Sequence, residues 1–94
     1  MGHLPSVELL ERTHSFPCAY MFKVIGKSDG GFVARVVAAV RDELADAADP
    51  PYSLRQARGG AHVAVTLQPR VQTALQVLAV YRRILKMAGL VMLL

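Results

Sequence analysis

The residues best suited to chemistry in this 94-residue chain gather in one aromatic-rich run, residues 14–26. His14 and Cys18 could act as base and nucleophile, because a neighbouring proton acceptor converts a thiol into the reactive thiolate. Cys18, however, alternates with Tyr20 and Phe22, and free cysteines are usually buried among apolar side chains. We interpret Cys18 as a small core residue, with a His14–Cys18 pair as the alternative.

Metal and acid–base chemistry find no support elsewhere in the sequence. The histidines, His3, His14 and His62, lack the spacing of zinc ligands, and Cys18 is the single cysteine. The acidic residues between positions 42 and 49 are typical of a solvated helix end and do not form a catalytic carboxylate pair. We expect no catalytic residue, no metal and no cofactor, and a protein that is not an enzyme.

The tripeptide Gly26-Lys27-Ser28 resembles the end of a phosphate-binding loop. Such a loop needs another glycine five residues earlier, so that successive backbone N–H groups can surround a phosphate. That position holds Met21, inside an expected strand. We therefore interpret the tripeptide as a strand-to-helix turn and reject nucleotide hydrolysis.

The charge distribution leaves nucleic-acid binding open as an alternative. Residues 1–50 hold five Lys or Arg against seven Asp or Glu, whereas residues 51–94 hold six Lys or Arg and no carboxylate. A half-chain without acids can attract phosphate. An RNA-reading strand would need aromatic rings, and residues 58–65 offer only His62 for stacking. The basic patch would consist of Arg55, Arg58, Arg70, Arg82, Arg83 and Lys86.

Apolar and polar side chains alternate in several short segments, which indicates strands. Four strands are predicted, at residues 17–25, 52–58, 61–68 and 90–94. Pro17 opens the first strand at a position where no interior ladder bond is lost, and Gly26 ends it. The pair Gly59-Gly60 predicts a tight turn between the middle two strands.

Apolar residues at helical spacing predict two longer helices. The first follows a cap at Ser28 or Asp29 and runs to about residue 44. The second is opened by Pro69, carries Leu75 on its buried side and is capped by Gly89. One predicted helix therefore follows the first strand, and the other follows the third strand.

The resulting order, a short helix capped by Ser6 and then β-α-β-β-α-β, predicts an α+β, ferredoxin-like fold. Two helices would cover one face of a four-stranded antiparallel sheet and leave the other face open. We assign residues 1–15 to an N-terminal extension that contains the short helix. Residues 16–94 would form a single ferredoxin-like domain.

The run Phe16-Pro-Cys-Ala-Tyr-Met-Phe-Lys-Val-Ile-Gly26 resembles the opening strand of the YbeD-like family, small bacterial proteins of unknown function. The Arg-Gly-Gly hairpin and Tyr81-Arg82 before a terminal apolar strand are similar too, so the resemblance spans residues 7–94. It implies a fold similar to ACT-type regulatory domains, without known catalytic residues. The hairpin at residues 59–61 departs from the longer polar turn of many members.

The open sheet face is the surface that we expect to be used, because apolar patches on monomers tend to mark interfaces. Alternation places on it Ala19, Met21, Lys23, His62, Ala64 and Thr66, with Val91 and Leu93 as further candidates. We predict a non-enzymatic regulatory or interaction module that uses this face or a strand edge to bind a protein partner or a second copy of itself. Small-ligand sensing is a variant that the ACT-type resemblance implies, and nucleic-acid binding is the alternative.

The composition predicts a cytoplasmic protein without membrane contact. No apolar run approaches the length of about 20 residues that a membrane helix needs. No signal peptide is evident, and the single cysteine cannot form an internal disulfide.

Overall fold

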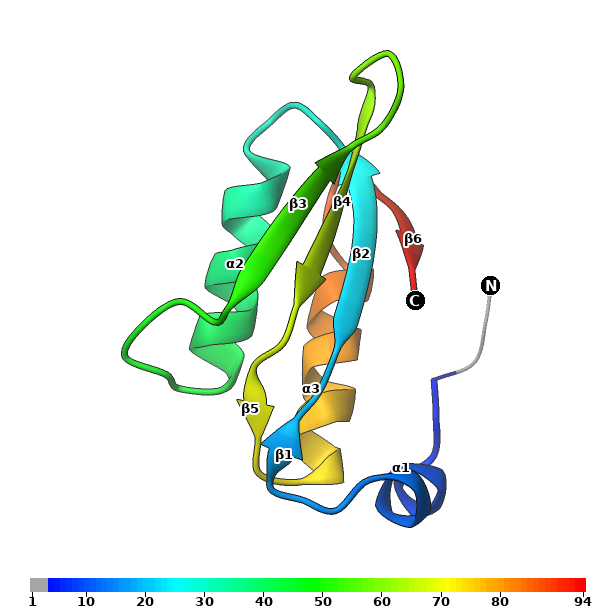
Figure 1. Cartoon of the computed structure of the whole chain (residues 1–94), viewed down its shortest axis with the longest axis vertical. Coiled ribbons are helices and arrows are strands. Elements are labelled where there is room, and N and C mark those ends of the chain that lie inside the picture. Colours follow the sequence, from blue (N-terminus) through cyan, green and yellow to red (C-terminus); the bar gives the residue numbers. More distant parts are fainter. Residues whose placement is uncertain (1–3) are drawn as a thin grey trace.

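The computed structural model describes residues 4–94 and consists of one helical layer packed against one sheet (Figure 1). The elements are α1 (Val7–Thr13), β1 (Cys18–Ala19), β2 (Phe22–Lys27), α2 (Phe32–Glu43), β3 (Tyr52–Gln56), β4 (His62–Leu67), β5 (Arg70–Val71), α3 (Ala74–Leu85) and β6 (Leu90–Leu93). The main sheet has the order β3-β4-β2-β6, and all neighbours are antiparallel. Helices α2 and α3 lie behind it in the view of Figure 1. The predicted ferredoxin-like fold is confirmed.

Strand β2 lies between β4 and β6, and its alternation orients the sheet. Phe22 and Val24 are fully buried beneath the helices, whereas Lys23 between them is exposed. Val24 lies opposite Val65 of β4, which is also fully buried. Each such apolar side chain contributes about 1.5–3 kcal/mol when it is removed from water. A shift of register by one residue would expose this whole set, so the pattern holds β2 in place.

The predicted first strand is interrupted, which corrects the continuous segment 17–25. Its start, β1, pairs with β5 in a separate two-stranded sheet. The interruption lies where Tyr20 faces the loop after β4. The Tyr20 N–H donates to the Pro69 carbonyl at 3.0 Å, but Pro69 has no N–H to return. The Gln68 N–H donates instead to Pro51, so the ladder breaks between β1 and β2.

The strand does not end at Gly26, because β2 continues through Lys27. Gly26 is buried, and a Cβ atom at this position would overlap the ring of Phe32. Phe32 is the first residue of α2 and is 1% exposed. The glycine therefore makes room for an aromatic ring and is not a strand terminator.

Helix α2 begins later than predicted. Neither Ser28 nor Asp29 caps it; the N-cap is Gly31, without a side-chain cap bond. Gly30 and Gly31 have φ values of 67° and 68°, in the left-handed region that glycine tolerates best. The two glycines thus form the turn that carries the chain from β2 into α2.

Helix α3 is not opened by Pro69, which lies between β4 and β5. The N-cap is Thr73, whose hydroxyl accepts a hydrogen bond from the Gln76 N–H at 3.2 Å. The buried face of α3 is formed by Ala74, Val77, Leu78, Val80, Tyr81 and Ile84 and therefore differs from the predicted one. Leu75, expected to be buried, is 65% exposed.

Helix α1 begins after the predicted Ser6 cap, and the Ser6 hydroxyl accepts from the Leu9 N–H at 3.1 Å. Leu10 is 2% exposed and belongs to the common core, while Leu9 remains about half exposed. The short helix packs on α3. The assignment of residues 1–15 as an extension and 16–94 as the domain stays a prediction.

The core contains a hydrogen-bonded pair of tyrosines. The hydroxyls of Tyr20 and Tyr81 lie 3.0 Å apart, and Tyr81 meets the ring of Phe22 edge-on. Burial, together with the hydrogen bond to Tyr20, raises the pKa of the Tyr81 phenol. This pair satisfies polar atoms that would otherwise be buried without partners.

Candidate functional site

The candidate functional site is the sheet face opposite the helices, here called the open face. In an antiparallel sheet, residues directly opposite each other project to the same side. Lys23 lies opposite Thr66, and Thr66 lies opposite Ser53, so one row crosses three strands. In the next row, Ile25 lies between Ala64 of β4 and Met92 of β6. The open face comprises Lys23, Ile25, Lys27, Ser53, Arg55, His62, Ala64, Thr66, Met92 and Leu94.

The open face combines an apolar strip with a one-signed charge. Ile25 and Ala64 are half-buried at its centre, and Met92 and Leu94 beside them are 49% and 58% exposed. Its charged residues are Lys23, Lys27 and Arg55. None of its ten residues is acidic or carries a Phe, Tyr or Trp ring.

The six residues predicted for this surface divide into two groups. Lys23, His62, Ala64 and Thr66 lie on the open face, as alternation indicated. Ala19 lies in β1 of the small sheet instead, and Met21, 55% exposed, lies in the interruption between β1 and β2. The proline that breaks the ladder moves both of them off the main sheet. Their role in binding stays a prediction.

The list from the sequence also missed part of the open face. Ile25 has the same parity as Lys23, so alternation alone could have found it. In the last strand, Leu93 is not on this face as expected: it lies opposite the buried Val24, and Met92 lies opposite Ile25. Val91 lies where the pairing of β6 with β2 shifts register. Such a bulge reverses the parity of the residues beyond it.

A shallow hollow of about 310 Å³ lies at the end of the open face. Its lining residues are Lys27, Ser28, Asp29, Gly60, Ala61 and His62. Gln56 braces it, because its side-chain amide donates to the Ser28 hydroxyl at 2.9 Å and to the Gly60 carbonyl at 3.0 Å. Lys27 and His62 face each other in register, so the hollow could hold a small anionic group beside Asp29. Small-ligand binding stays a prediction.

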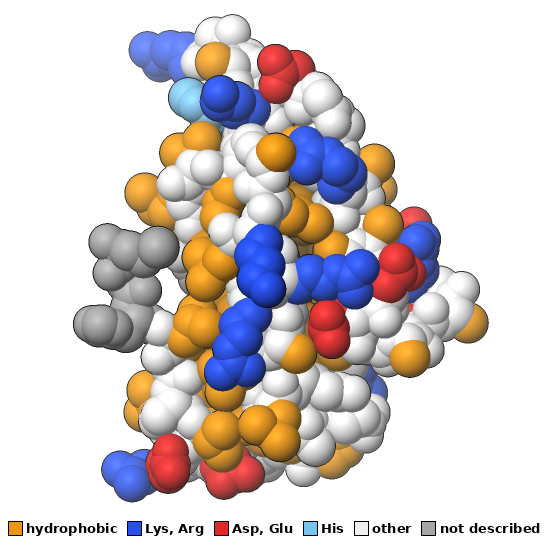
Figure 2. Space-filling model, turned by 180° about the vertical axis from the view of Figure 1, so that it is seen from behind, with side chains coloured by type: hydrophobic (Ala, Val, Ile, Leu, Met, Phe, Trp, Pro, Cys, Tyr) orange, Lys and Arg blue, Asp and Glu red, His pale blue; other side chains and the backbone are white. Residues whose placement is uncertain are grey.

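The six predicted basic residues do not form one patch. Arg55 projects from the open face, Arg58 lies in the β3–β4 hairpin and Arg70 lies in β5. Arg82 and Arg83, by contrast, belong to α3 on the other side of the sheet, and Lys86 caps that helix in place of the predicted Gly89. Figure 2 shows this helical face, where Lys and Arg side chains gather with acidic side chains beside part of them. The fold therefore divides the basic half-chain between two faces.

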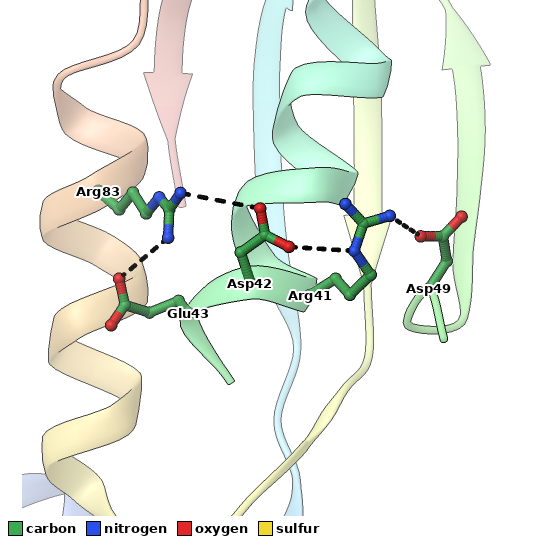
Figure 3. Close-up of polar contacts among 5 residues, drawn as sticks. All are labelled: Arg41, Asp42, Glu43, Asp49 and Arg83. Carbon is green, nitrogen blue, oxygen red and sulfur yellow. Dashed lines mark hydrogen bonds and ion pairs between the residues drawn. The ribbon is translucent and has the colours of Figure 1, made fainter. Parts of the chain in front are cut away.

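Acidic residues also neutralise part of the helical face (Figure 3). Arg83 contacts Glu43 at 3.5 Å and Asp42 at 4.0 Å. Asp42 also accepts from Arg41, which donates to Asp49 at 2.9 Å. These hydrogen bonds raise the pKa of Arg41, first through Asp42 and then through Asp49. A phosphate backbone would have to compete with these ion pairs.

The catalytic alternative gains no geometric support. The His14 ring stacks against Tyr20 at 4.9 Å between centroids, and its Nδ1 lies 2.9 Å from the Thr13 hydroxyl. Cys18 is half-buried and packs against the core. In the described part of the chain, no cluster of three His, Cys, Asp or Glu side chains could hold a metal. His3 lies outside the described residues.

The helices offer no route across a membrane. Among residues 4–94, no helix is both long enough and apolar enough to span a membrane. The predicted cytoplasmic location stays a prediction.

The architecture and its exposed sheet define the class of protein: a small ferredoxin-like α+β domain with one helix-covered and one open face. The chain belongs to the family described as "Protein of unknown function (DUF493)", whose model matches residues 11–94. It is similar to UPF0250 protein NE1487 of Nitrosomonas europaea, with 28% identity over 67 residues that cover 71% of this chain and 77% of the relative. The prediction that the chain belongs to a small uncharacterised bacterial family is thus confirmed.

Proposed function

We propose that this chain is a non-enzymatic interaction module whose open face binds an acidic protein partner. A regulatory role similar to that of ACT-type domains, and the YbeD-like kinship, form part of this proposal. The observation that carries it is the composition of the open face. An apolar strip is bordered by cations, and none of the ten residues of this face has an Asp or Glu side chain.

The charge of the open face argues against its pairing with a second copy. Two such faces in contact would bring Lys23, Lys27 and Arg55 of both copies together without an acid between them. Like-charge juxtaposition in an interface costs several kcal/mol. A partner with apolar anchors and Asp or Glu around them would match both features.

The absence of Phe, Tyr and Trp rings from the open face favours protein over nucleic acid. Single-stranded nucleic acids are held largely by stacking of bases on aromatic side chains. The centre of the open face offers Ile25, Ala64 and Met92 instead, and aliphatic groups suit the leucines and methionines of a protein interface. Nucleic-acid binding remains the alternative, through Lys23, Lys27 and the divided basic residues.

The test compares capture of cellular proteins by three baits: the wild type, Met92→Glu and Leu75→Glu. Leu75 is the matched control, because it is an exposed apolar residue in helix α3, 65% exposed against 49% for Met92. We expect a partner that the wild type and Leu75→Glu retain and that Met92→Glu loses. With the purified partner, Met92→Glu should weaken binding roughly tenfold to hundredfold, the effect of removing one interface anchor.

Nuclease treatment distinguishes an acidic protein partner from a nucleic acid. Binding to an acidic protein should survive nuclease and weaken when Lys23→Ala is combined with Arg55→Ala. Capture that nuclease abolishes would favour the nucleic-acid alternative. Equal capture by Met92→Glu and Leu75→Glu would refute a role for the open face.

A further inference from the structure

One edge of the sheet is unprotected against strand addition. The sheet ends at β3 on one side and at β6 on the other (Figure 1). The β6 side carries a register irregularity opposite Ile25 and Gly26, and such bulges discourage edge-to-edge pairing. β3 pairs with β4 in unbroken register from Tyr52 to Gln56. It contains neither a proline nor a bulge.

The hydrogen bonds of β3 show which main-chain groups point outward. The Ala57 N–H donates to the His62 carbonyl, and the Gln68 N–H donates to the Pro51 carbonyl. Hydrogen-bonded pairs alternate along an antiparallel ladder, so the odd-numbered residues between these two also face β4. The residues whose N–H and C=O point to the free edge are therefore Tyr52, Leu54 and Gln56.

Two of these residues, Tyr52 and Leu54, have large apolar side chains. Tyr52 and Leu54 lie opposite the buried Leu67 and Val65, which places them on the helical side of the sheet. Nevertheless they are 47% and 53% exposed. The free edge thus combines unsatisfied main-chain groups with an uncovered apolar pair.

We propose that β3 pairs antiparallel with β3 of a second copy, around a two-fold axis at Leu54. An axis at Leu54 is the one that pairs all three outward residues with each other. An axis at Ser53 would set Gln56 opposite Pro50, which has no N–H, and an axis at Arg55 would set the two arginines opposite each other. Leu54 then faces Leu54 of the other copy, and Tyr52 faces Gln56. On the opposite side of the ribbon Arg55 faces Ser53, so no like charges lie opposite each other.

Charges beyond the strand ends support the same register. Arg58 lies four residues after Leu54, and Pro50 lies four residues before it. The two-fold axis therefore places Arg58 of each copy beside Pro50 and the adjacent Asp49 of the other. Asp49 is about half exposed despite its contact with Arg41, so it remains able to accept a second cation.

The dimer is independent of the proposed function. Edge pairing joins two sheets into one and leaves both open faces free, on the same side of the joined sheet. An acidic partner could then be bound twice. Met92→Glu should accordingly leave the dimer intact, and loss of the dimer need not abolish binding to one open face.

Disulfide trapping tests the register in a Cys18→Ser background. Hydrogen-bonded antiparallel pairs have Cα atoms about 5.5 Å apart, within the range that a disulfide spans. Leu54→Cys should therefore form a covalent dimer under mild oxidation. Ser53→Cys is the control, since its symmetry mate lies about 8 Å away, diagonally across the two strands. Failure of Leu54→Cys to cross-link, or equal cross-linking by Ser53→Cys, would overturn the register.

Sedimentation tests the association itself. The wild type should sediment as a dimer at high protein concentration, and Leu54→Arg should be a monomer with an unchanged circular dichroism spectrum. Leu75→Arg, the same change at an exposed leucine of α3, should remain a dimer. A monomeric wild type, or dimers that persist in Leu54→Arg, would refute the proposal.

Discussion

The buried glycine of β2 provides a prediction whose sign distinguishes two physical effects. Glycine in a strand interior costs about 0.5–1 kcal/mol relative to alanine, because it loses more conformational freedom on folding. On that ground alone, Gly26→Ala should stabilise the protein. The close approach of the Phe32 ring predicts the opposite, since an added Cβ would overlap a side chain that is 1% exposed.

The steric term should be the larger one. Insertion of one methyl group into a packed core costs about 1–3 kcal/mol, and this ring has little freedom to retreat between β2 and α2. After the gain in conformational entropy is subtracted, Gly26→Ala should lower the free energy of unfolding by about 1–2 kcal/mol. For a domain of this size, each kcal/mol lowers the melting temperature by about 4–8 °C.

Urea unfolding followed by circular dichroism measures this change. The double variant Gly26→Ala/Phe32→Leu is the decisive comparison, because the smaller side chain leaves room for the new methyl group. Its destabilisation should be less than the sum of the two single effects, by about 0.5–3 kcal/mol of coupling. A neutral or stabilising Gly26→Ala, or additive effects in the double variant, would show that the ring does not restrict this position.

Two further predictions concern the cap of α3 and the tyrosine pair. Thr73→Ala should cost about 1 kcal/mol, because the Gln76 N–H loses its acceptor, whereas Thr73→Ser should retain most of the stability; equal losses in thermal unfolding would exclude capping as the cause. For Tyr81, the raised pKa means that the folded state keeps its proton above the ordinary value of 10.0 while the unfolded chain releases it. The contribution of Tyr81 to stability should therefore be constant below about pH 10 and fall at higher pH, and Tyr81→Phe should reduce this alkaline loss. Urea midpoints at about pH 9 and pH 11 measure it, and identical slopes in both proteins would contradict the assignment.

The order of elements and the two sides of the sheet were predictable from local pattern. Phe22 and Val24 alternate with Lys23, and this period of two places them on opposite faces whatever the rest of the chain does. Ser6 capped its helix as expected, because a cap bond involves residues only three apart. The open-face positions in β4 followed from the same alternation.

Other features depended on residues that are distant in sequence. Pro69 looked like a helix start, but its missing N–H interrupts the ladder with Tyr20, and Thr73 caps the helix instead. Gly26 looked like a strand end until the ring of Phe32 was placed against it. In each case the residue type is compatible with two local structures, and its contact with another element of the fold decides between them.

The candidate site shows the same division. Composition determined that the second half of the chain is basic, but α3 carries Arg82 and Arg83 to the helical face while β3 carries Arg55 to the open one. The bulge in β6 decides that Met92 joins Ile25 on the open face. By itself the sequence determined the periods, the Ser6 cap and the charges, because these are local properties. Only the tertiary structure decided which charges share a surface and which edge is free, because pairing and packing join residues that the chain holds far apart.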